Sequence, residues 1–408
     1  MNKLQLPPLS LYVHIPWCVR KCPYCDFNSH QLAAGAHQAK DGLPEAEYVA
    51  QLKRDLHSQL AWVQGRRLVS IFFGGGTPSL FSPAAIRAVL EAAERAVGFA
   101  DDIEITLEAN PGTFEQEKFA GYRAAGVNRL SIGVQSFDPQ QLHNLGRIHT
   151  GDEAAEALGM ARRAGFDNIN LDLMHGLPKQ TGEQALADLR RAVELEPEHI
   201  SWYQLTIEPN TAFYNAPPPT PGSARIAAMQ AGGREYLAEQ GYGRYEVSAY
   251  SRPGLAARHN LNYWSFGDYL GIGAGAHGKV TLLGEGNLVR SRRTRAPRDY
   301  LALLEETAGV LASPRAEAIA HDELPVEFLM NALRLVDGVP RETFPAYTGL
   351  SLAVLEQRWP GLRAMELVQP LERRIAASAF GFDYLDEILQ RFLVLTDPGL
   401  ESRWRNPH

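Results

Sequence analysis

Short apolar runs rich in β-branched and aromatic residues alternate with longer segments of helical spacing along the first half of this 408-residue chain. A helical segment such as 82–98 opens with Ser and Pro, residue types that commonly begin a helix. Alternation of this kind implies parallel strands joined by right-handed crossovers, and it predicts about six strand–helix units. The runs that we expect to be strands are 9–16, 67–76, 102–111, 128–137, 168–178 and 199–207.

Polar residues and glycines stand near the carboxyl ends of successive predicted strands. Gly74–Thr77 ends the second strand, Glu108 lies in the third, and Gln135 and Asp172 belong to later ones. A parallel barrel gathers its functional groups at this face, whereas a doubly wound sheet binds its ligand at a single switch point. The pattern therefore favours a barrel or part-barrel.

The chain changes character near residue 300. Two further strands, 244–251 and 269–278, extend the first part, and helical segments dominate the remainder of the chain. We expect residues 1–298 to form one α/β domain with strand extensions at its carboxyl end. Residues 299–408 are expected to form a smaller, mainly helical domain.

The composition excludes several classes of partner and location. A formal net charge of −7 gives no general attraction to nucleic acid, so we expect no nucleic-acid partner. The first residues lack the apolar stretch and cleavage site of a signal peptide, and no segment has about 18 consecutive apolar residues. We expect a cytoplasmic protein, with which peripheral contact at the inner membrane is compatible.

All three cysteines of the chain, Cys18, Cys22 and Cys25, follow the first predicted strand with the spacing C-x3-C-x2-C. An odd, clustered set does not resemble a disulfide framework. A structural zinc site would need a fourth ligand, for which His14 and His30 are candidates. A disulfide with one free thiol is a further alternative.

A third interpretation explains the odd number. Three thiolates hold three irons of a 4Fe–4S cluster and leave the fourth iron without a protein ligand. S-adenosylmethionine would chelate that iron through its amino and carboxylate groups. An electron from the cluster would then split the sulfonium bond and give a 5′-deoxyadenosyl radical.

The wider sequence resembles the radical S-adenosylmethionine superfamily and, within it, the oxygen-independent coproporphyrinogen III dehydrogenase-like group. The resemblance rests on "YVHIPWCVRKCPYCDF", "FFGGGTPS", "EANPG", "GVQSF", "NLGRIH", "NLDLMHGLPKQ" and the helical tail. It implies a (β/α)6 partial barrel with extensions, followed by the small C-terminal domain typical of the group. It also implies a 4Fe–4S cluster on Cys18, Cys22 and Cys25.

The resemblance also assigns a binding site for S-adenosylmethionine. The Gly-rich end of the second strand lets backbone approach a ligand closely, and carboxylates at strand ends attract its positive charge. An arginine forks onto its carboxylate. Taken singly, each of these residues is better explained as an ordinary helix cap, ion pair or packed aromatic, and the resemblance reverses that preference. The positions that match are Tyr12, Tyr24, Gly75, Gly76, Thr77, Glu108, Gln135, Arg147 and Asp172.

Two features place the chain within the group. The dehydrogenases continue the cluster motif as C-x3-C-x2-C-x-C, but Phe27 stands where the fourth cysteine would be. The segment "RHNLNYW" matches the H-N-x-x-Y-W signature of haem chaperones that resemble the dehydrogenases. In that signature His259 would be an iron ligand, while Asn260, Tyr263 and Trp264 would surround the macrocycle. A structural histidine beside core aromatics is the alternative, and His175 and His277 are other candidate ligands.

The expected function is therefore that of a haem chaperone that passes haem to acceptor apoproteins such as respiratory enzymes at the membrane. The resemblance implies an electron donor for the cluster and is compatible with a homodimer. The alternative function is that of a coproporphyrinogen III dehydrogenase, in which the adenosyl radical leads to oxidative decarboxylation of propionates to vinyl groups.

Overall fold

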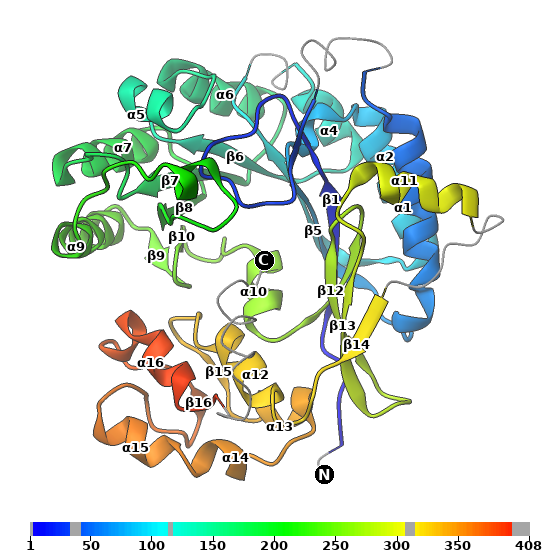
Figure 1. The fold of residues 1–408 in the computed structure, drawn as a ribbon, viewed down its shortest axis with the longest axis vertical. Coiled ribbons are helices and arrows are strands. Elements are labelled where there is room, and N and C mark those ends of the chain that lie inside the picture. Colours follow the sequence, from blue (N-terminus) through cyan, green and yellow to red (C-terminus); the bar gives the residue numbers. More distant parts are fainter. Residues whose placement is uncertain (1–2, 33–41, 113–116, 307–314, 394–408) are drawn as a thin grey trace.

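A computed structural model describes residues 3–32, 42–112, 117–306 and 315–393 of the chain (Figure 1). Six parallel strands form its centre, and each is hydrogen-bonded to the next in chain order. They are β1 (Leu9–Ile15), β4 (Leu68–Gly75), β5 (Phe99–Ala109), β6 (Arg129–Gln135), β7 (Ile169–His175) and β8 (His199–Gln204). This arrangement confirms the predicted (β/α)6 part-barrel.

Helices cover the outer face of these strands (Figure 1). They are α1 (Glu45–Ser58), α2 (Pro83–Ala96), α4 (Phe119–Ala125), α5 (Pro139–Asn144), α6 (Gly151–Arg163), α7 (Gly182–Glu194) and α9 (Ser223–Glu239). Their first residues follow the expected capping chemistry. The Ser82 side chain accepts the Ala85 N–H at the start of α2, and Thr150 and Thr181 form capping boxes on α6 and α7.

The sheet stays open because β1 and β8 each pair with additional strands instead of with each other. On the β8 side lie β10 (Ala249–Ser251) and β9 (Gly243–Arg244), both antiparallel to their neighbours. On the β1 side, β11 (Asp268–Ile272) runs parallel to β1 and is followed by an antiparallel series. That series is β12 (His277–Leu282), β13 (Asn287–Arg292) and β14 (Arg315–Ala318).

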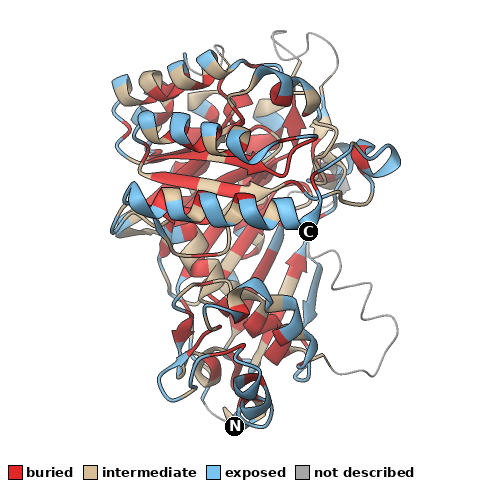
Figure 2. Ribbon diagram, turned by 90° about the vertical axis from the view of Figure 1, so that its left-hand side faces the viewer, coloured by how far each residue is buried: buried red, intermediate tan, exposed pale blue. Residues whose placement is uncertain are grey.

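The barrel strands alternate between an apolar outer row and a polar inner row. In β1, Leu9, Leu11 and Val13 belong to the buried core that packs under the helices. Ser10 instead bonds the Ser70 hydroxyl of β4 at 2.7 Å across the strands. Because successive side chains of a strand point to opposite faces, this alternation leaves a polar interior for the part-barrel. Figure 2 shows the buried strands beneath helices whose outer faces are exposed.

The carboxyl-terminal region has a core of its own, beneath the barrel in Figure 1. Its elements are α12 (Leu324–Ala332), β15 (Val339–Pro340), α13 (Thr343–Thr348), α14 (Ala353–Glu356), α15 (Trp359–Ala364), β16 (Arg374–Ile375) and α16 (Leu385–Gln390). This second core also takes Phe266 and Leu288 from the preceding part of the chain.

The predicted boundary between residues 298 and 299 stays a prediction. It falls within α11 (Pro297–Glu306), which packs on the barrel: Tyr300 lies in the first core, and its hydroxyl bonds the Asp55 carboxylate at 2.8 Å. The first residue beyond position 298 in the second core is Ile319. No helix in the described ranges is long and apolar enough to cross a membrane.

Candidate functional site

The cysteines lie on a loop at the carboxyl end of β1. The loop leaves β1 through the short strand β2 (Trp17–Cys18), which pairs in parallel with β3 (His30–Gln31) at the far end of the same loop. Between them, the N–H of Cys25 donates to the Cys22 carbonyl at 3.2 Å. Cys18 is buried and the other two are half-buried, and all three thiols are free of disulfides. This result excludes the disulfide alternative for the structure described.

Hydrogen-bond donors face the sulfur atoms. The Thr77 hydroxyl lies 3.5 Å from the Cys18 sulfur, and an Arg147 guanidinium nitrogen lies 3.7 Å from the Cys22 sulfur. Burial raises the pKa of the Cys18 thiol to about 11. A thiol of this kind loses its proton when it binds a metal ion, and the hydrogen-bond donors around the sulfur stabilise the resulting thiolate.

The two candidate fourth ligands of a zinc site, His14 and His30, have other hydrogen-bond partners in the structure. Within the described residues, no three His, Cys, Asp or Glu side chains lie close enough together to hold one metal ion. Both nitrogens of His14 are occupied, by the Asn28 carbonyl and by the Tyr12 hydroxyl, each at 2.9 Å. His30 contacts the Asn28 side-chain oxygen at 3.3 Å. A 4Fe–4S cluster takes each thiolate on a separate iron, so it needs no convergence on one point and no fourth ligand.

The glycines at the end of β4 allow the cysteine loop to lie directly against that strand. The Gly76 N–H bonds the Ile15 carbonyl at 2.8 Å, and the Thr77 N–H bonds the Trp17 carbonyl at 2.8 Å. A Cβ on Gly76 would stand 2.5 Å from that Trp17 oxygen. At Gly75, φ is +117° and a Cβ would meet the His14 ring at 2.6 Å, so both positions require glycine.

Two carboxyl groups project into the barrel without a salt bridge to any described residue: Glu108 of β5 and Asp172 of β7. The Gly75 N–H donates to Glu108 at 3.2 Å, and Ser131 and Asn170 donate to Asp172 at 3.0 and 2.8 Å. Burial and the neighbouring Asp172 raise the pKa of Glu108 to about 8. Burial likewise raises the pKa of Asp172. Arg129 interacts electrostatically with Asp172, whereas Glu108 forms no ion pair with a described side chain, so a buried Glu108 favours a positively charged ligand.

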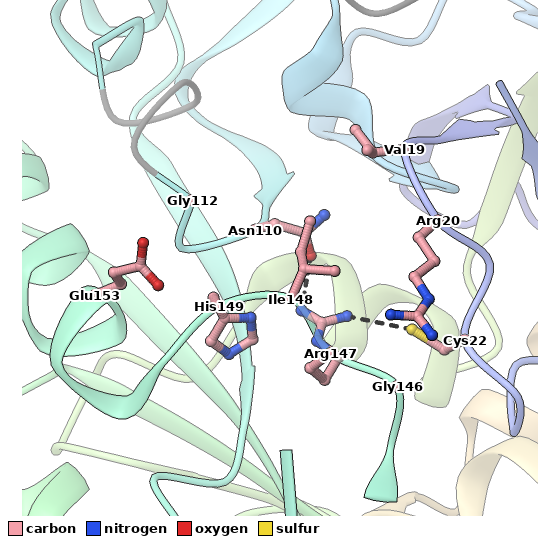
Figure 3. Close-up of a pocket in the computed structure, with 10 residues that line it drawn as sticks. All are labelled: Val19, Arg20, Cys22, Asn110, Gly112, Gly146, Arg147, Ile148, His149 and Glu153. Atoms are coloured by element: carbon pink, nitrogen blue, oxygen red, sulfur yellow. Dashed lines mark hydrogen bonds between the residues drawn. The ribbon is translucent and has the colours of Figure 1, made fainter. Parts of the chain in front are cut away.

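Arg147 joins these groups to the cysteine loop. Besides Cys22, its guanidinium contacts the Asn110 side-chain oxygen at 2.8 Å and the Gly133 carbonyl at 2.5 Å, while its buried Nε has no described hydrogen-bond partner. A cavity of about 160 Å³ opens beside it. Figure 3 shows Arg20 and Cys22 on one side of this cavity and His149 and Glu153 on the other, with Arg147 between them.

The remaining predicted positions line the same barrel interior. The pKa of Tyr12 is raised, first by burial and then by Glu108. Tyr24 interacts electrostatically with Arg147 and Cys22 and packs against Phe213. The Gln135 side chain accepts the Tyr203 hydroxyl at 2.7 Å, and its backbone has φ +70°, which is rare for a residue other than glycine. Hydrogen bonds and electrostatic interactions thus connect the predicted positions along the barrel interior, from the cysteine loop to Asp172.

Two residues of this site were missed at the sequence level. Asn110 holds both Thr77, at 3.1 Å, and Arg147. Tyr203 bonds Gln135 and interacts electrostatically with Asp172 and Glu108. Asn110 follows the signal that identified the other positions, because it lies at the carboxyl end of the predicted strand 102–111. Tyr203 lies in the middle of the predicted strand 199–207 but near the end of the observed strand β8.

The residues predicted for haem lie elsewhere, on α10 (Arg258–Trp264), which the Glu104 carboxylate caps through the N–H groups of Arg258 and His259. The His259 ring is stacked on Phe72 at 4.3 Å and meets the edge of Tyr263 at 4.4 Å. Burial lowers its pKa to about 3, and its Nδ1 has no described partner. The ring is therefore neutral, as an iron ligand requires, but covered in this conformation.

The other members of the motif have structural contacts. The Asn260 amide donates to the Tyr245 hydroxyl at 2.9 Å. Tyr263 packs on Tyr269 at 4.3 Å, and the Arg334 guanidinium lies 4.2 Å above the Trp264 ring. A haem that bound His259 would require α10 to move away from Phe72.

A parallel part-barrel with three free cysteines after its first strand and buried acids beside them defines a radical S-adenosylmethionine protein. Residues 12–192 match the model of the Radical SAM superfamily, and residues 319–373 match the HemN C-terminal domain. This class implies S-adenosylmethionine and an iron–sulfur cluster, and the cysteine loop and the acids fit both. Within the class, the chain belongs to the family of the heme chaperone HemW.

Similarity to curated proteins covers nearly the whole chain. The heme chaperone HemW of Escherichia coli (strain K12) is 47% identical over 391 residues, which are 96% of this chain and 100% of that protein. HemW of Haemophilus influenzae is 46% identical over 96% of this chain and 99% of its own length. The mitochondrial radical S-adenosyl methionine domain-containing protein 1 of Bos taurus is 35% identical over 97% and 89%.

A solved structure supports the fold. Coproporphyrinogen III oxidase HemN from Escherichia coli, a radical SAM enzyme, matches with a TM-score of 0.77 and 24% identity over 96% of this chain and 91% of that one. At this identity the similarity concerns the fold alone.

Proposed function

We propose that this chain is a haem chaperone that binds haem, a 4Fe–4S cluster and S-adenosylmethionine, and that inserts the haem into acceptor apoproteins such as respiratory enzymes. The observation that carries the proposal is the 47% identity to a heme chaperone over the full length of that protein. Phe27, half exposed where the dehydrogenases have a further cysteine, supports the same assignment.

The cysteine loop would hold the cluster and the barrel interior would hold the nucleoside cofactor. When bound, the cluster would supply an electron to the sulfonium group. The chain's own residues would orient the cofactor and balance its charge: Glu108 would face its positive charge, Arg147 would donate to its carboxylate, and Asp172 would accept from the ribose hydroxyls. Tyr12, Tyr24 and Gln135 complete the walls, and Gly75–Thr77 lets the backbone approach.

His259 is proposed as the haem ligand, with Asn260, Tyr263 and Trp264 around the macrocycle once α10 has moved. The partners are haem, the acceptor apoproteins and a donor of one electron for the cluster, and a homodimer is compatible with this role. We propose that the protein is cytoplasmic and meets membrane-bound acceptors at the inner membrane.

An anaerobic haem titration tests cargo binding. We expect one equivalent of haem to shift the Soret band of the wild-type protein, and His259→Ala to weaken binding at least tenfold. His175→Ala is the matched control, because His175 is also buried with a pKa lowered to about 4. The absence of a saturable Soret shift in the wild type would contradict the haem assignment. Loss of binding only in His175→Ala would show that His175, and not His259, is the iron ligand.

A turnover assay tests the alternative function, coproporphyrinogen III dehydrogenase. The reconstituted, reduced protein is incubated with coproporphyrinogen III and S-adenosylmethionine, with HemN as the positive control. We expect no protoporphyrinogen IX from this chain. Turnover comparable to that of HemN would overturn the chaperone assignment.

A further inference from the structure

A chain of buried and partly buried hydrogen bonds runs from α10 through the barrel to Asp172. Asn260 on α10 donates to the Tyr245 hydroxyl at 2.9 Å, and Tyr245 contacts Nε2 of His199 at 2.9 Å. Nδ1 of His199 contacts the Asn170 side-chain oxygen at 2.6 Å, and the Asn170 amide donates to Asp172 at 2.8 Å. The chain therefore joins the haem motif to a carboxylate of the proposed cofactor site.

The chemistry of the groups fixes the direction of every bond. An amide oxygen only accepts, so Nδ1 of His199 carries the proton. Burial holds the pKa of His199 well below its usual range, so the ring is neutral and Nε2 accepts from Tyr245. The Tyr245 hydroxyl in turn accepts from Asn260 and from the backbone N–H of Ala257, the N-cap of α10. In each of the four bonds from Asn260 to Asp172, the donor is therefore the group nearer to α10 and the acceptor is the group nearer to Asp172.

The helix at the other end has two distinct states in the proposed function. In the structure α10 packs against the barrel, and we call this state seated. Glu104 caps the amino terminus of the helix, Asn260 bonds Tyr245, and Phe72 covers the His259 ring. Coordination of haem by His259 requires this seat to be broken. A group that strengthens the chain of bonds favours the seated state.

We propose that Asn170, His199 and Tyr245 are positioning residues that couple occupancy of the Asp172 site to the seating of α10. The inference rests on the proposed function, because it takes Asp172 to contact the ribose of S-adenosylmethionine. Ribose hydroxyls that donate to Asp172 favour its ionised form. The anion strengthens the bond from Asn170, and each neighbouring bond is polarised in the same sense. S-adenosylmethionine therefore holds α10 seated, and haem coordination by His259 opposes it.

Hydrogen exchange of the α10 amides tests the coupling without haem. We expect saturating S-adenosylmethionine to slow exchange in residues 258–264 of the reconstituted wild-type protein at least fivefold. In Tyr245→Phe, which removes only the hydroxyl, the slowing should fall below twofold. Asn260→Ala should do the same from the other end of the bond.

Tyr242→Phe is the matched control, because this fully buried tyrosine donates to the Pro197 carbonyl at 2.7 Å and takes no part in the chain of bonds. It should keep the wild-type slowing. The proposed coupling would be overturned if Tyr245→Phe kept the wild-type slowing of exchange. It would also be overturned if Tyr242→Phe lost the slowing to the same extent as Tyr245→Phe. A wild-type protein that binds S-adenosylmethionine without slowing α10 would also overturn it. Failure to bind S-adenosylmethionine would contradict the proposed function itself.

Reciprocity provides a second readout in the haem-binding protein. Since linkage is symmetric for binding free energies, S-adenosylmethionine should weaken haem binding by the same factor by which haem weakens S-adenosylmethionine binding. We expect this factor to be about fivefold or more in the wild type and close to one in Tyr245→Phe. A wild-type factor of one would overturn the coupling.

Discussion

At the scale of single residues, the site is governed by buried polar and acidic groups whose interactions the described side chains satisfy only in part. Burial and the neighbouring Asp172 raise the pKa of Glu108 to about 8. The Arg147 Nε is buried without a partner. Such groups are costly unless a ligand completes them, so they support the proposal that a charged, polar ligand binds in this part of the barrel.

The raised pKa of Glu108 predicts a pH dependence of cofactor binding. A cationic ligand favours the ionised carboxylate and lowers its pKa, so binding releases a proton below about pH 8. The affinity for S-adenosylmethionine should therefore rise by up to about tenfold per pH unit between about pH 6 and about pH 8. Equilibrium binding of the cofactor across this range measures the slope.

Glu108→Gln is the control for this prediction, because it keeps the shape of the side chain and removes its titration. The variant should bind more weakly and retain only the pH dependence of the ligand itself. Equal slopes in the two proteins would show that Glu108 does not face the cofactor's charge.

At the scale of secondary-structure elements, the site depends on how the ends of strands are held. The cysteine loop lies against the end of β4 because Gly76 has no side chain. The turn after β6 is held by Asp188 of α7, which accepts from the Ser136 hydroxyl at 2.8 Å and the Phe137 N–H at 2.7 Å. Each contact places a site residue, Thr77 in the first case and Gln135 in the second.

Gly76→Ala should disturb the cluster site through backbone crowding. Its Cβ would stand 2.5 Å from the Trp17 oxygen, so we expect a loss of about 1–3 kcal/mol of unfolding free energy and a marked fall in iron content after reconstitution. Gly182→Ala is the control, since nothing lies within 4 Å of a Cβ at that position. Wild-type iron content in Gly76→Ala would contradict the close packing.

Asp188 predicts a pH dependence of stability. Burial raises the pKa of its carboxyl group from 3.8 to about 6. The protonated carboxyl therefore contributes fully to the unfolding free energy below about pH 4, and this contribution is lost as the pH rises through about 6. The unfolding free energy of the wild type relative to Asp188→Asn should fall by up to about 3 kcal/mol over this interval. Denaturation at several pH values measures the difference, and parallel curves would refute the assignment.

The sequence predicts these elements well where a local pattern determines them. The predicted strands 102–111 and 168–178 correspond to β5 and β7, which carry the predicted site residues Glu108 and Asp172. Local patterns do not show which strands meet at the edges of a sheet, so β11–β14 beside β1 were not foreseen as one continuous sheet. The predicted single strand 244–251 is two short strands, β9 and β10, separated by a turn that presents Tyr245 to α10.

The motif on α10 marks the limit of sequence reasoning about the site. The letters "RHNLNYW" identify a family signature, but they do not say that Phe72 covers His259 or that Asn260 bonds Tyr245. Both contacts are made by residues outside the motif. Only the packing of the barrel against this helix determines them.

At the scale of the whole molecule, α10 packs against both parts of the chain, against β1 and β4 of the barrel and against α12 of the carboxyl-terminal region. Phe266, just after the helix, packs on Phe328 of α12 at 5.2 Å, and Trp264 packs beneath Arg334. Figure 1 shows α10 between the barrel and the carboxyl-terminal helices. The position of α10 therefore depends on both parts of the chain.

Phe328→Ala tests this dependence. Removing a fully buried phenylalanine should cost about 3–5 kcal/mol of stability and should speed hydrogen exchange in α10 while the iron content stays unchanged. Equilibrium denaturation and exchange mass spectrometry measure the two effects. Unchanged exchange in α10 would show that its position is set by the barrel alone.

The central claim is that three cysteines hold a 4Fe–4S cluster whose fourth iron is open to S-adenosylmethionine. The most direct test is the EPR spectrum of the anaerobically reconstituted, reduced protein before and after addition of S-adenosylmethionine. The account predicts a 4Fe–4S signal that changes on addition and that is lost when Cys18, Cys22 or Cys25 is replaced by serine. A tetrahedral zinc site, or a cluster signal that S-adenosylmethionine leaves unaltered, would contradict it.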